Sequence, residues 1–316
     1  MDPGRFSSTG RTNAGRSWRE RSLPPAVVLL LVLLSACQSG ESSGTSPVGD
    51  PPPPAVNPSP RKGVGTWSFA GGASAMADVA VSWYYTWRVD RQWEPAPTRV
   101  QFVPMIWDET HVTPDELTRA VDTGAGVLLG YNEPDHADQA NMTVAEALDL
   151  WPLLEGTALR LGSPATAGNP ARAGSWLERF MDGAARRGSR IDFVCVHWYG
   201  QGTDATTEAR ELEGFLRAVH DKYQKPIWLT EFALVEWTTP PAFPTYAEQA
   251  AFVRQALPML ESLPFVERYA WFALPPWAAG GVSATTNLYE VSGAPTAVGT
   301  AYESLGLLLG RAGAGH

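Results

Sequence analysis

Two glutamates at the ends of apolar runs are the residues of this sequence best suited to acid–base chemistry. Glu133 ends the run GVLLGYNE (126–133), and Glu231 lies late in PIWLTEFAL (226–234). Either glutamate alone is typical of a solvated strand end, because charged side chains are usually exposed. Two facing carboxylates, however, can hydrolyse a glycosidic bond: one protonates the leaving oxygen, and the other attacks the anomeric carbon or activates water. The pair therefore indicates glycoside hydrolysis if the fold brings both acids together.

Short apolar runs bounded by Gly or Pro predict the strands that carry these acids. Runs of this length fit strands that are buried on both faces of a parallel sheet. Helical segments alternate with them, and Thr143 with Glu146 has the spacing of a capping box, as has Thr113 with Glu116. The runs cover 63–69, 82–87, 101–107, 126–133, 159–165, 191–199, 226–234 and 269–274, and the expected helices include 113–124, 143–151, 174–188, 204–224, 246–262 and 297–306, with only a short helix over 72–81.

This alternation over about 250 residues predicts an α/β fold, a single-domain (β/α)8 TIM barrel. An open doubly wound sheet is the alternative, but no Gly-rich phosphate fingerprint follows the first run, which argues against its nucleotide-binding version. In a barrel, chemistry gathers at the C-terminal ends of the strands. That rule places both glutamates on one rim, together with side chains from other runs: Trp87, Trp107, His197, Tyr199 and Trp271.

Tryptophan is abundant, with 13 residues, and many of these lie near predicted strand ends. Core packing is the alternative interpretation for any one of them, but flat apolar rings on a rim also suit sugar rings. The tryptophans predicted to bind substrate are Trp67, Trp87, Trp107, Trp198 and Trp271, and Trp237 and Trp277 extend the set into loops.

Several motifs, in their order along the chain, resemble glycoside hydrolase family 128, within the retaining clan A of (β/α)8 glycosidases. These motifs are SWYYTW (82–87), FVPMIW (102–107), GYNEPD (130–135), VHWYG (196–200), WLTEFAL (228–234), YAWFAL (269–274) and NLYEVSGAPTAVGTAY (287–302). The resemblance implies cleavage of β-1,3-glucan. Another β-linked polysaccharide, such as β-1,4-mannan or β-1,4-glucan, and a surface lipoprotein that binds glycan without cutting it are the alternatives. A binding module has no need of two opposed acids, which argues against the last.

The resemblance also implies roles for individual residues. Glu133 matches the acid/base, Asn132 the asparagine that hydrogen-bonds the sugar 2-hydroxyl, and Glu231 the nucleophile. We expect Pro134 to bias Glu133 towards an extended backbone, because the ring of a proline restricts the residue before it.

Three further positions follow from the same resemblance. Tyr199 matches the tyrosine that holds the nucleophile, with His197 one inward position behind it, and Trp271 matches the tryptophan under the sugar at subsite −1. Thr86 departs from the pattern, in which we would expect asparagine.

The N-terminal residues 1–36 have the layout of a bacterial secretory signal, with five arginines before the apolar run AVVLLLVLLSA (26–36). This run reaches only about 16 Å as a helix, against roughly 30 Å of hydrocarbon, so a transmembrane anchor is the poorer interpretation. LSAC (34–37) resembles a lipobox, which predicts lipidation of Cys37; ordinary cleavage beside an idle cysteine is the alternative. Residues 37–60, rich in Ser, Gly and Pro, form a tether, and 61–316 the catalytic domain. We expect secretion across the bacterial inner membrane and a lipid anchor in the cell envelope.

The charge and the residue composition limit the classes of molecule that this chain is expected to bind. Residues 1–36 carry five arginines and two acids, so their removal takes the formal charge from −9 to −12. Such a chain is ill suited to bind nucleic acid or anionic lipid through a basic face, so membrane contact is expected through the anchor only. Cys195 is most simply an inert core thiol, and five histidines without an HExxH motif predict no metal. We expect no cofactor, a monomer, and a β-glucan polysaccharide as substrate.

Overall fold

The computed structural model describes residues 58–92 and 99–312, and side chains as far as residue 304. Its largest sheet has six strands in the order β3-β2-β1-β8-β7-β6, with every neighbouring pair parallel. Strands β4 and β5 form a second parallel pair. The strands are β1 (Lys62–Gly65), β2 (Trp83–Tyr85), β3 (Gln101–Phe102), β4 (Val127–Leu128), β5 (Arg160–Leu161), β6 (Val194–Gly200), β7 (Ile227–Leu234) and β8 (Val266–Phe272).

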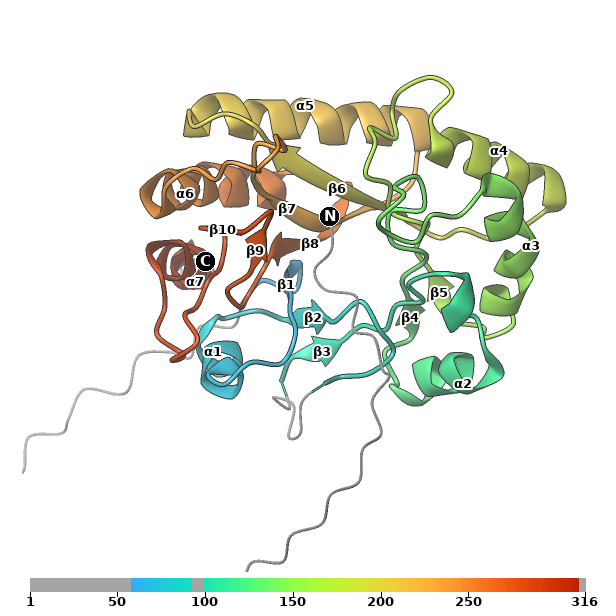
Figure 1. Ribbon diagram of the computed structural model, residues 1–316, viewed down its shortest axis with the longest axis horizontal. Helices are drawn as coiled ribbons and strands as arrows, with labels where there is room; N and C mark the ends of the chain where they lie inside the picture. The colour runs from blue at the N-terminus through green and yellow to red at the C-terminus, as the bar shows by residue number, and fades with distance from the viewer. Residues whose placement is uncertain (1–57, 93–98, 313–316) are drawn as a thin grey trace, which may run out of the picture. The chain divides into compact units, whose positions relative to one another are not determined.

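Two isolated parallel bridges join the β4–β5 pair to the six-stranded sheet, one on each side. Met105 pairs with Leu129 between β3 and β4, and Gly162 pairs with Phe193 between β5 and β6. The eight strands therefore follow one another in chain order around a barrel, which confirms the predicted fold class. Figure 1 shows the helices around the outside of these strands.

Most strands lead into a helix, as a (β/α)8 chain requires. The helix α1 that follows β1 is short, as predicted, and a 3₁₀ turn, η1 (Glu109–His111), precedes α2. At α3, Thr143 and Glu146 form the expected capping box. Within the described residues, no helix combines the length and hydropathy needed to cross a membrane. The helices are α1 (Gly72–Asp78), α2 (Pro114–Asp122), α3 (Val144–Glu155), α4 (Trp176–Arg187), α5 (Ala205–Tyr223), α6 (Tyr246–Ser262) and α7 (Ala297–Ala312), and a hairpin of β9 (Ala278–Ala279) and β10 (Val282–Ser283) follows β8.

Aromatic rings fill the N-terminal half of the barrel. The ring centroid of Trp228 lies 5.2 Å from that of Trp83 and 4.4 Å from that of Phe193. Glycines make room for them: a Cβ at Gly63 would lie 2.2 Å from Trp83, and one at Gly162 would lie 2.6 Å from Phe193. The interior is thus a packed core, and the open space for chemistry lies beyond it, towards the C-terminal strand ends.

Contacts with the barrel begin slightly before the predicted domain start at residue 61. The Ser82 hydroxyl donates hydrogen bonds to the carbonyl oxygen of Ser59 at 2.8 Å and to that of Pro58 at 3.4 Å. Residue 58 is therefore already placed against the fold. The expected signal peptide, Cys37 and most of the predicted tether lie outside the described residues.

Candidate active site

Strand β6 presents every second side chain to the barrel interior. Phe193, just before the strand, and Cys195 belong to the interior cluster, whereas Val194 and Val196 belong to the cluster that faces the helices. This alternation, which follows from the pleat of a strand, continues to His197 at the mouth. The buried thiol of Cys195 thus occupies a core position, and burial raises its pKa.

Strand β7 places Glu231 beside His197 through a bulge. Trp228 faces the interior, so strict alternation would aim Thr230 into the mouth. The register with β6 passes, however, from Leu229 opposite Val196 to Glu231 opposite His197, leaving Thr230 as the extra residue. A bulge of this kind re-aims the side chains that follow it. Glu231 therefore points into the mouth.

The carboxylate of Glu231 is buried and surrounded by donors. Its side chain is 7% exposed. The indole Nε1–H of Trp87 donates to Oε1 at 2.8 Å, and the hydroxyl of Tyr199 donates to Oε2 at 2.5 Å. The hydroxyl of Tyr85 lies 3.4 Å from Oε1 and donates mainly to the carbonyl oxygen of Thr230, at 2.8 Å. These donors fix the orientation of the carboxylate towards the mouth.

Opposing influences act on the pKa of Glu231. Burial is the largest and raises this pKa, and the nearby charge of Glu133 raises it further. The charge of His197 and the hydrogen bonds from Tyr199 and Trp87 lower it, and the balance lies above the usual value for glutamate. Because each donor favours the charged form, the ionised carboxylate depends on keeping all of them.

Glu133 occupies the end of the β4 segment with an unusual backbone. Its φ is +44°, so the predicted extended conformation is wrong: the residue lies in the left-handed region, which non-glycine residues adopt at a cost of about 1–3 kcal/mol. Its backbone N–H donates to the carbonyl oxygen of Ala165 at 2.7 Å. This turn out of the barrel leaves the Glu133 side chain directed back at His197.

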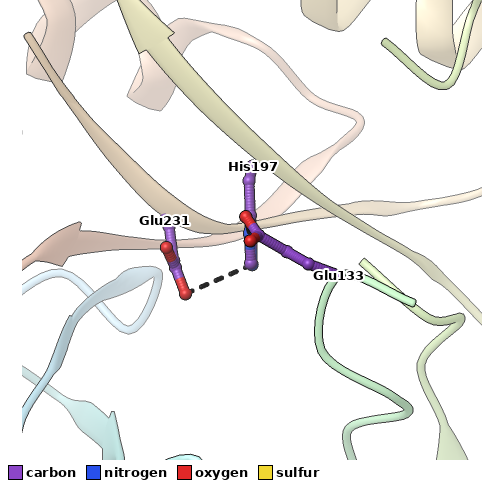
Figure 2. A group of neighbouring side chains, drawn as sticks. All are labelled: Glu133, His197 and Glu231. Atoms are coloured by element: carbon purple, nitrogen blue, oxygen red, sulfur yellow. Dashed lines mark hydrogen bonds and ion pairs between the residues drawn. The ribbon is translucent and has the colours of Figure 1, made fainter. Parts of the chain in front are cut away.

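His197 lies between the two glutamates, as Figure 2 shows. Its Nδ1 is 2.9 Å from Glu133 Oε1, and its Nε2 is 3.5 Å from Glu231 Oε1. One oxygen of each carboxylate and one ring nitrogen lie within 4.8 Å of one another. Burial lowers the pKa of His197, but the charge of Glu231, the hydrogen bond with Glu133 and the charge of Glu133 outweigh it, so the pKa is raised. His197, predicted to bind substrate, thus contacts the glutamates themselves.

Asn132, the residue before Glu133, has one side-chain atom without a hydrogen-bond partner in the described part of the chain. The side chain is buried, and its Nδ2 donates to Gln139 Oε1 at 3.2 Å. Its Oδ1 has no hydrogen-bond partner among the described residues. A buried acceptor without a partner is costly, and a hydroxyl donated by a sugar would satisfy it.

Two of the predicted substrate-binding tryptophans lie on the wrong side of the barrel wall. Trp198 falls between inward-facing residues of β6, and its ring stacks on Phe252 of α6 at 5.7 Å. Trp271 is fully buried and donates its indole N–H to the carbonyl oxygen of Thr286. Because side chains alternate along a strand, both positions face the helices, and the sugar-stacking role expected of them is corrected.

Phe272, which the sequence reasoning missed, occupies the inward position beside Trp271. Its ring centroid lies 5.5 Å from that of Trp87, 6.2 Å from that of Trp67 and 6.1 Å from that of Tyr199. The alternation from the interior residue Ala270 is the signal that could have identified it. Trp87 has two contacts in the site: its indole N–H donates to Glu231, and its ring packs against Phe272.

Further aromatics line the same end of the barrel. Trp237, 39% exposed, packs edge-on against Tyr199 at 5.3 Å and lies 6.3 Å from Trp277. Trp107 is half-buried beside the interior cluster, with His111 6.3 Å away. The rim therefore offers several partly exposed rings around the glutamates.

The donor set suits proton chemistry better than metal binding. Glu133, His197 and Glu231 are the one group in the described chain close enough to hold an ion. Each glutamate already has a hydrogen-bond partner: Nδ1 of His197 lies 2.9 Å from Glu133, and Trp87 and Tyr199 donate to Glu231. A cation would have to displace these donors, which the ionised carboxylate needs.

A separate pocket of about 540 Å³ lies at the opposite, N-terminal end of the strands. Arg61, Lys225, Glu267 and Arg268 are among its lining residues. Its one carboxylate, that of Glu267, is paired with Arg160. A pocket without two opposed acids has no means for the acid–base chemistry that the other end supports.

Known proteins are similar to this chain in sequence and in fold. The glycosyl hydrolase catalytic core family matches residues 68–302. An endo-β-1,3-glucanase of glycoside hydrolase family 128, subgroup I, from Amycolatopsis mediterranei, solved with laminaritriose, is 46% identical; the match covers 78% of this chain and 99% of that chain, with a TM-score of 0.73. Structures of that enzyme with either of two glutamates replaced by alanine also hold laminarioligosaccharides. A subgroup II endo-β-1,3-glucanase from Sorangium cellulosum is 30% identical, covering 77% and 98% with a TM-score of 0.64.

One curated relative is longer than this chain. Alkali-sensitive linkage protein 1 of Schizosaccharomyces pombe is 30% identical over 236 residues, which span 72% of this chain and 41% of that protein. The fold, the paired glutamates and these matches define a glycosidase. The chain belongs to glycoside hydrolase family 128.

The donors on Glu231 predict a graded effect on the pH profile. Tyr199→Phe removes a hydrogen bond that stabilises the ionised carboxylate, so the pKa of Glu231 should rise. The acid limb of kcat/KM should then move to higher pH by about 1 pH unit, with at least roughly tenfold loss of activity at the wild-type optimum. Tyr85→Phe, whose hydroxyl is 3.4 Å away, is the matched control and should shift the limb less. Equal shifts in the two variants would contradict this arrangement.

Proposed function

We propose that the protein hydrolyses β-1,3-glucan, with retention of anomeric configuration, by a two-glutamate double displacement. The observation that carries the proposal is the pair of carboxylates at the barrel mouth, one oxygen of each within 4.8 Å of the other and His197 between them. Retaining glycosidases hold their two carboxyl groups about 5–5.5 Å apart, whereas inverting enzymes leave about 6.5–9.5 Å for a water molecule. The spacing here supports direct attack by a carboxylate.

Each side chain then has a defined task. In the first step Glu133 gives its proton to the leaving glycosidic oxygen while a carboxylate oxygen of Glu231 bonds to the anomeric carbon. In the second step Glu133, now a carboxylate, takes a proton from water as that water displaces Glu231. The open Oδ1 of Asn132 accepts the 2-hydroxyl, a contact that strengthens in the transition state.

The arrangement of the aromatic rim supports a curved polymer as the substrate. Trp67 and Trp87 lie on the β1–β2 side of the mouth, and Trp237 and Trp277 follow β7 and β8. A β-1,3-linked chain curves, so its rings present faces at changing angles and suit platforms set around a mouth. Each aromatic contact with a sugar contributes about 1 kcal/mol, on the scale of stacked aromatic pairs. The family 128 relatives named as endo-β-1,3-glucanases support the same linkage.

We also propose that the enzyme is exported across the bacterial inner membrane and anchored to the cell envelope through a lipid on Cys37, as a monomer. The support is in the sequence: five arginines, an eleven-residue apolar run, and Cys37 at its end, followed by residues rich in Ser, Gly and Pro. Such a tether would let the domain reach a polymer outside the membrane.

A substrate panel tests the linkage. With a purified domain of residues 58–316, kcat/KM should be at least tenfold higher on laminarin than on carboxymethyl-cellulose, barley glucan or galactomannan. Domain lacking the Glu231 carboxylate is the control for contaminating activity. A tenfold preference for a β-1,4-linked polymer would overturn the β-1,3 assignment and leave the two-glutamate mechanism intact.

Azide rescue tests the two roles separately. Alanine at position 133 or glycine at 231 should each lower turnover of laminarin by orders of magnitude without unfolding the barrel. With an activated aryl glycoside, azide should rescue Glu231→Gly and give the inverted α-glycosyl azide, because a small anion replaces the missing nucleophile. Azide should rescue Glu133→Ala with the retained β-glycosyl azide, because the covalent intermediate still forms. The same anomer from both variants would show that the roles are misassigned.

Metabolic labelling tests the anchor. Cells expressing the full chain and fed a clickable fatty acid should label the wild type but not Cys37→Ala, because the thiol is the acylation site. Cys195→Ala is the matched control and should label normally. Labelling that persists in Cys37→Ala, or wild-type enzyme released unlabelled into the medium, would contradict the lipid anchor.

A further inference from the structure

His197 is the basic side chain that contacts both glutamates. Its side chain is 1% exposed; Nδ1 forms a hydrogen bond with Glu133, whereas Nε2 faces Glu231 Oε1 at 3.5 Å, an ion-pair distance, and has no hydrogen-bond partner among the described residues. Within residues 58–92 and 99–304, no lysine or arginine forms an ion pair with either glutamate. An acid pair buried without a counter-charge is costly, so the state of this imidazole decides the charge of the whole group.

The reaction moves one negative charge across this imidazole. Before attack Glu231 is the carboxylate and Glu133 carries the proton. When the glycosidic bond breaks, the proton of Glu133 goes to the leaving oxygen and Glu231 becomes a neutral ester. The negative charge has then passed from Glu231 to Glu133. In the second step, water gives a proton to Glu133 and releases Glu231 as a carboxylate, so the charge returns to Glu231.

We propose that His197 remains doubly protonated through both steps and serves as the shared counter-ion of the two glutamates, paired with whichever carries the charge. The inference rests on the double displacement proposed above. An imidazolium has one N–H for each carboxylate, whereas a neutral ring must turn a lone pair towards one of them. With the ring protonated, Glu133, His197 and Glu231 sum to zero charge before and after the attack. His197 acts through the glutamates and is a positioning residue.

The surroundings of His197 favour the charged ring. The acids that act on it are Glu231 on β7, Glu133 at the end of β4, and Asp135 in the following loop. The hydroxyls of Tyr199 and Tyr85 are directed at Glu231 and at the carbonyl of Thr230. Burial opposes protonation, but the carboxylates outweigh it and hold the pKa of His197 above its ordinary value.

The ¹⁵N chemical shifts of the imidazole ring report directly whether His197 is protonated at one or both nitrogens. The protein has five histidines, so ¹⁵N-histidine labelling gives few signals, and loss of one set in His197→Gln assigns it. At the pH of maximal activity, both ring nitrogens of His197 should have imidazolium shifts in the free enzyme. They should keep them after a 2-fluoro-glycosyl fluoride has trapped the Glu231 ester. A neutral ring in either state, accepting a proton from Glu133 at Nδ1, would overturn the proposal.

The pH profile of His197→Gln supplies the second readout. Glutamine keeps an N–H donor but removes the positive charge. An opposite charge at this distance lowers a carboxyl pKa, so its loss should move the acid limb of kcat/KM to higher pH by about 1–3 pH units. His220→Gln is the matched control; its ring stacks on Phe265 at 4.3 Å near the N-terminal strand ends, and its profile should match the wild type.

The outcomes separate two failures. A large loss of kcat with an unmoved acid limb would mean that His197 is only structural. A protonated His197 in a protein that cleaves no glucan would instead contradict the proposed function, because the NMR measurement on the free enzyme needs no turnover.

Discussion

The burial of one ionised carboxylate, that of Glu231, is the constraint on which the site depends. A carboxylate withdrawn from water is destabilised by several kcal/mol unless it is hydrogen-bonded and paired. The partners here come from separate parts of the barrel: Trp87 follows β2, and Tyr199 and His197 belong to β6. In the sheet, β2 and β7 are separated by β1 and β8. Only the curling of the strands into a barrel brings these groups onto one carboxylate.

The aromatic core beneath the mouth makes this arrangement rigid. Tyr85 stacks on Trp83 at 6.0 Å and contacts Trp87 at 4.6 Å, so two of the groups near Glu231 rest on the packed interior. A donor whose rotamer is fixed by packing loses little entropy when it binds its acceptor. The apolar N-terminal half of the barrel and the polar site at its C-terminal end are therefore one structure: the first holds the second in the geometry that the chemistry requires.

Sequence reasoning could reach the barrel and the pair of glutamates, because the rule for strand ends needs only the order of the runs. It could not reach which face each residue occupies. YAWFAL (269–274) is apolar throughout, so nothing in its composition separates the outward Trp271 from the inward Phe272. In β7, the bulge at Thr230 reverses the alternation that Trp228 begins. Glu133 likewise turns to a positive φ where the following proline favours an extended backbone. These features depend on strand pairing and on the turn out of the barrel, which are tertiary effects.

The charged side chains of the site lie in the barrel mouth and the rim around it is aromatic, an arrangement suited to binding an uncharged polymer. The acids and their imidazole lie deep in the mouth, with Glu133 15% exposed and Glu231 7% exposed, whereas Trp237 on the rim is 39% exposed. A glucan that covers such a site expels water from it, and each interaction inside then acts in a lower dielectric. An unpaired charge would make that desolvation unfavourable. A group whose charges balance internally makes it tolerable, so the same pairing that stabilises the empty site also permits a sugar without charges of its own to close it.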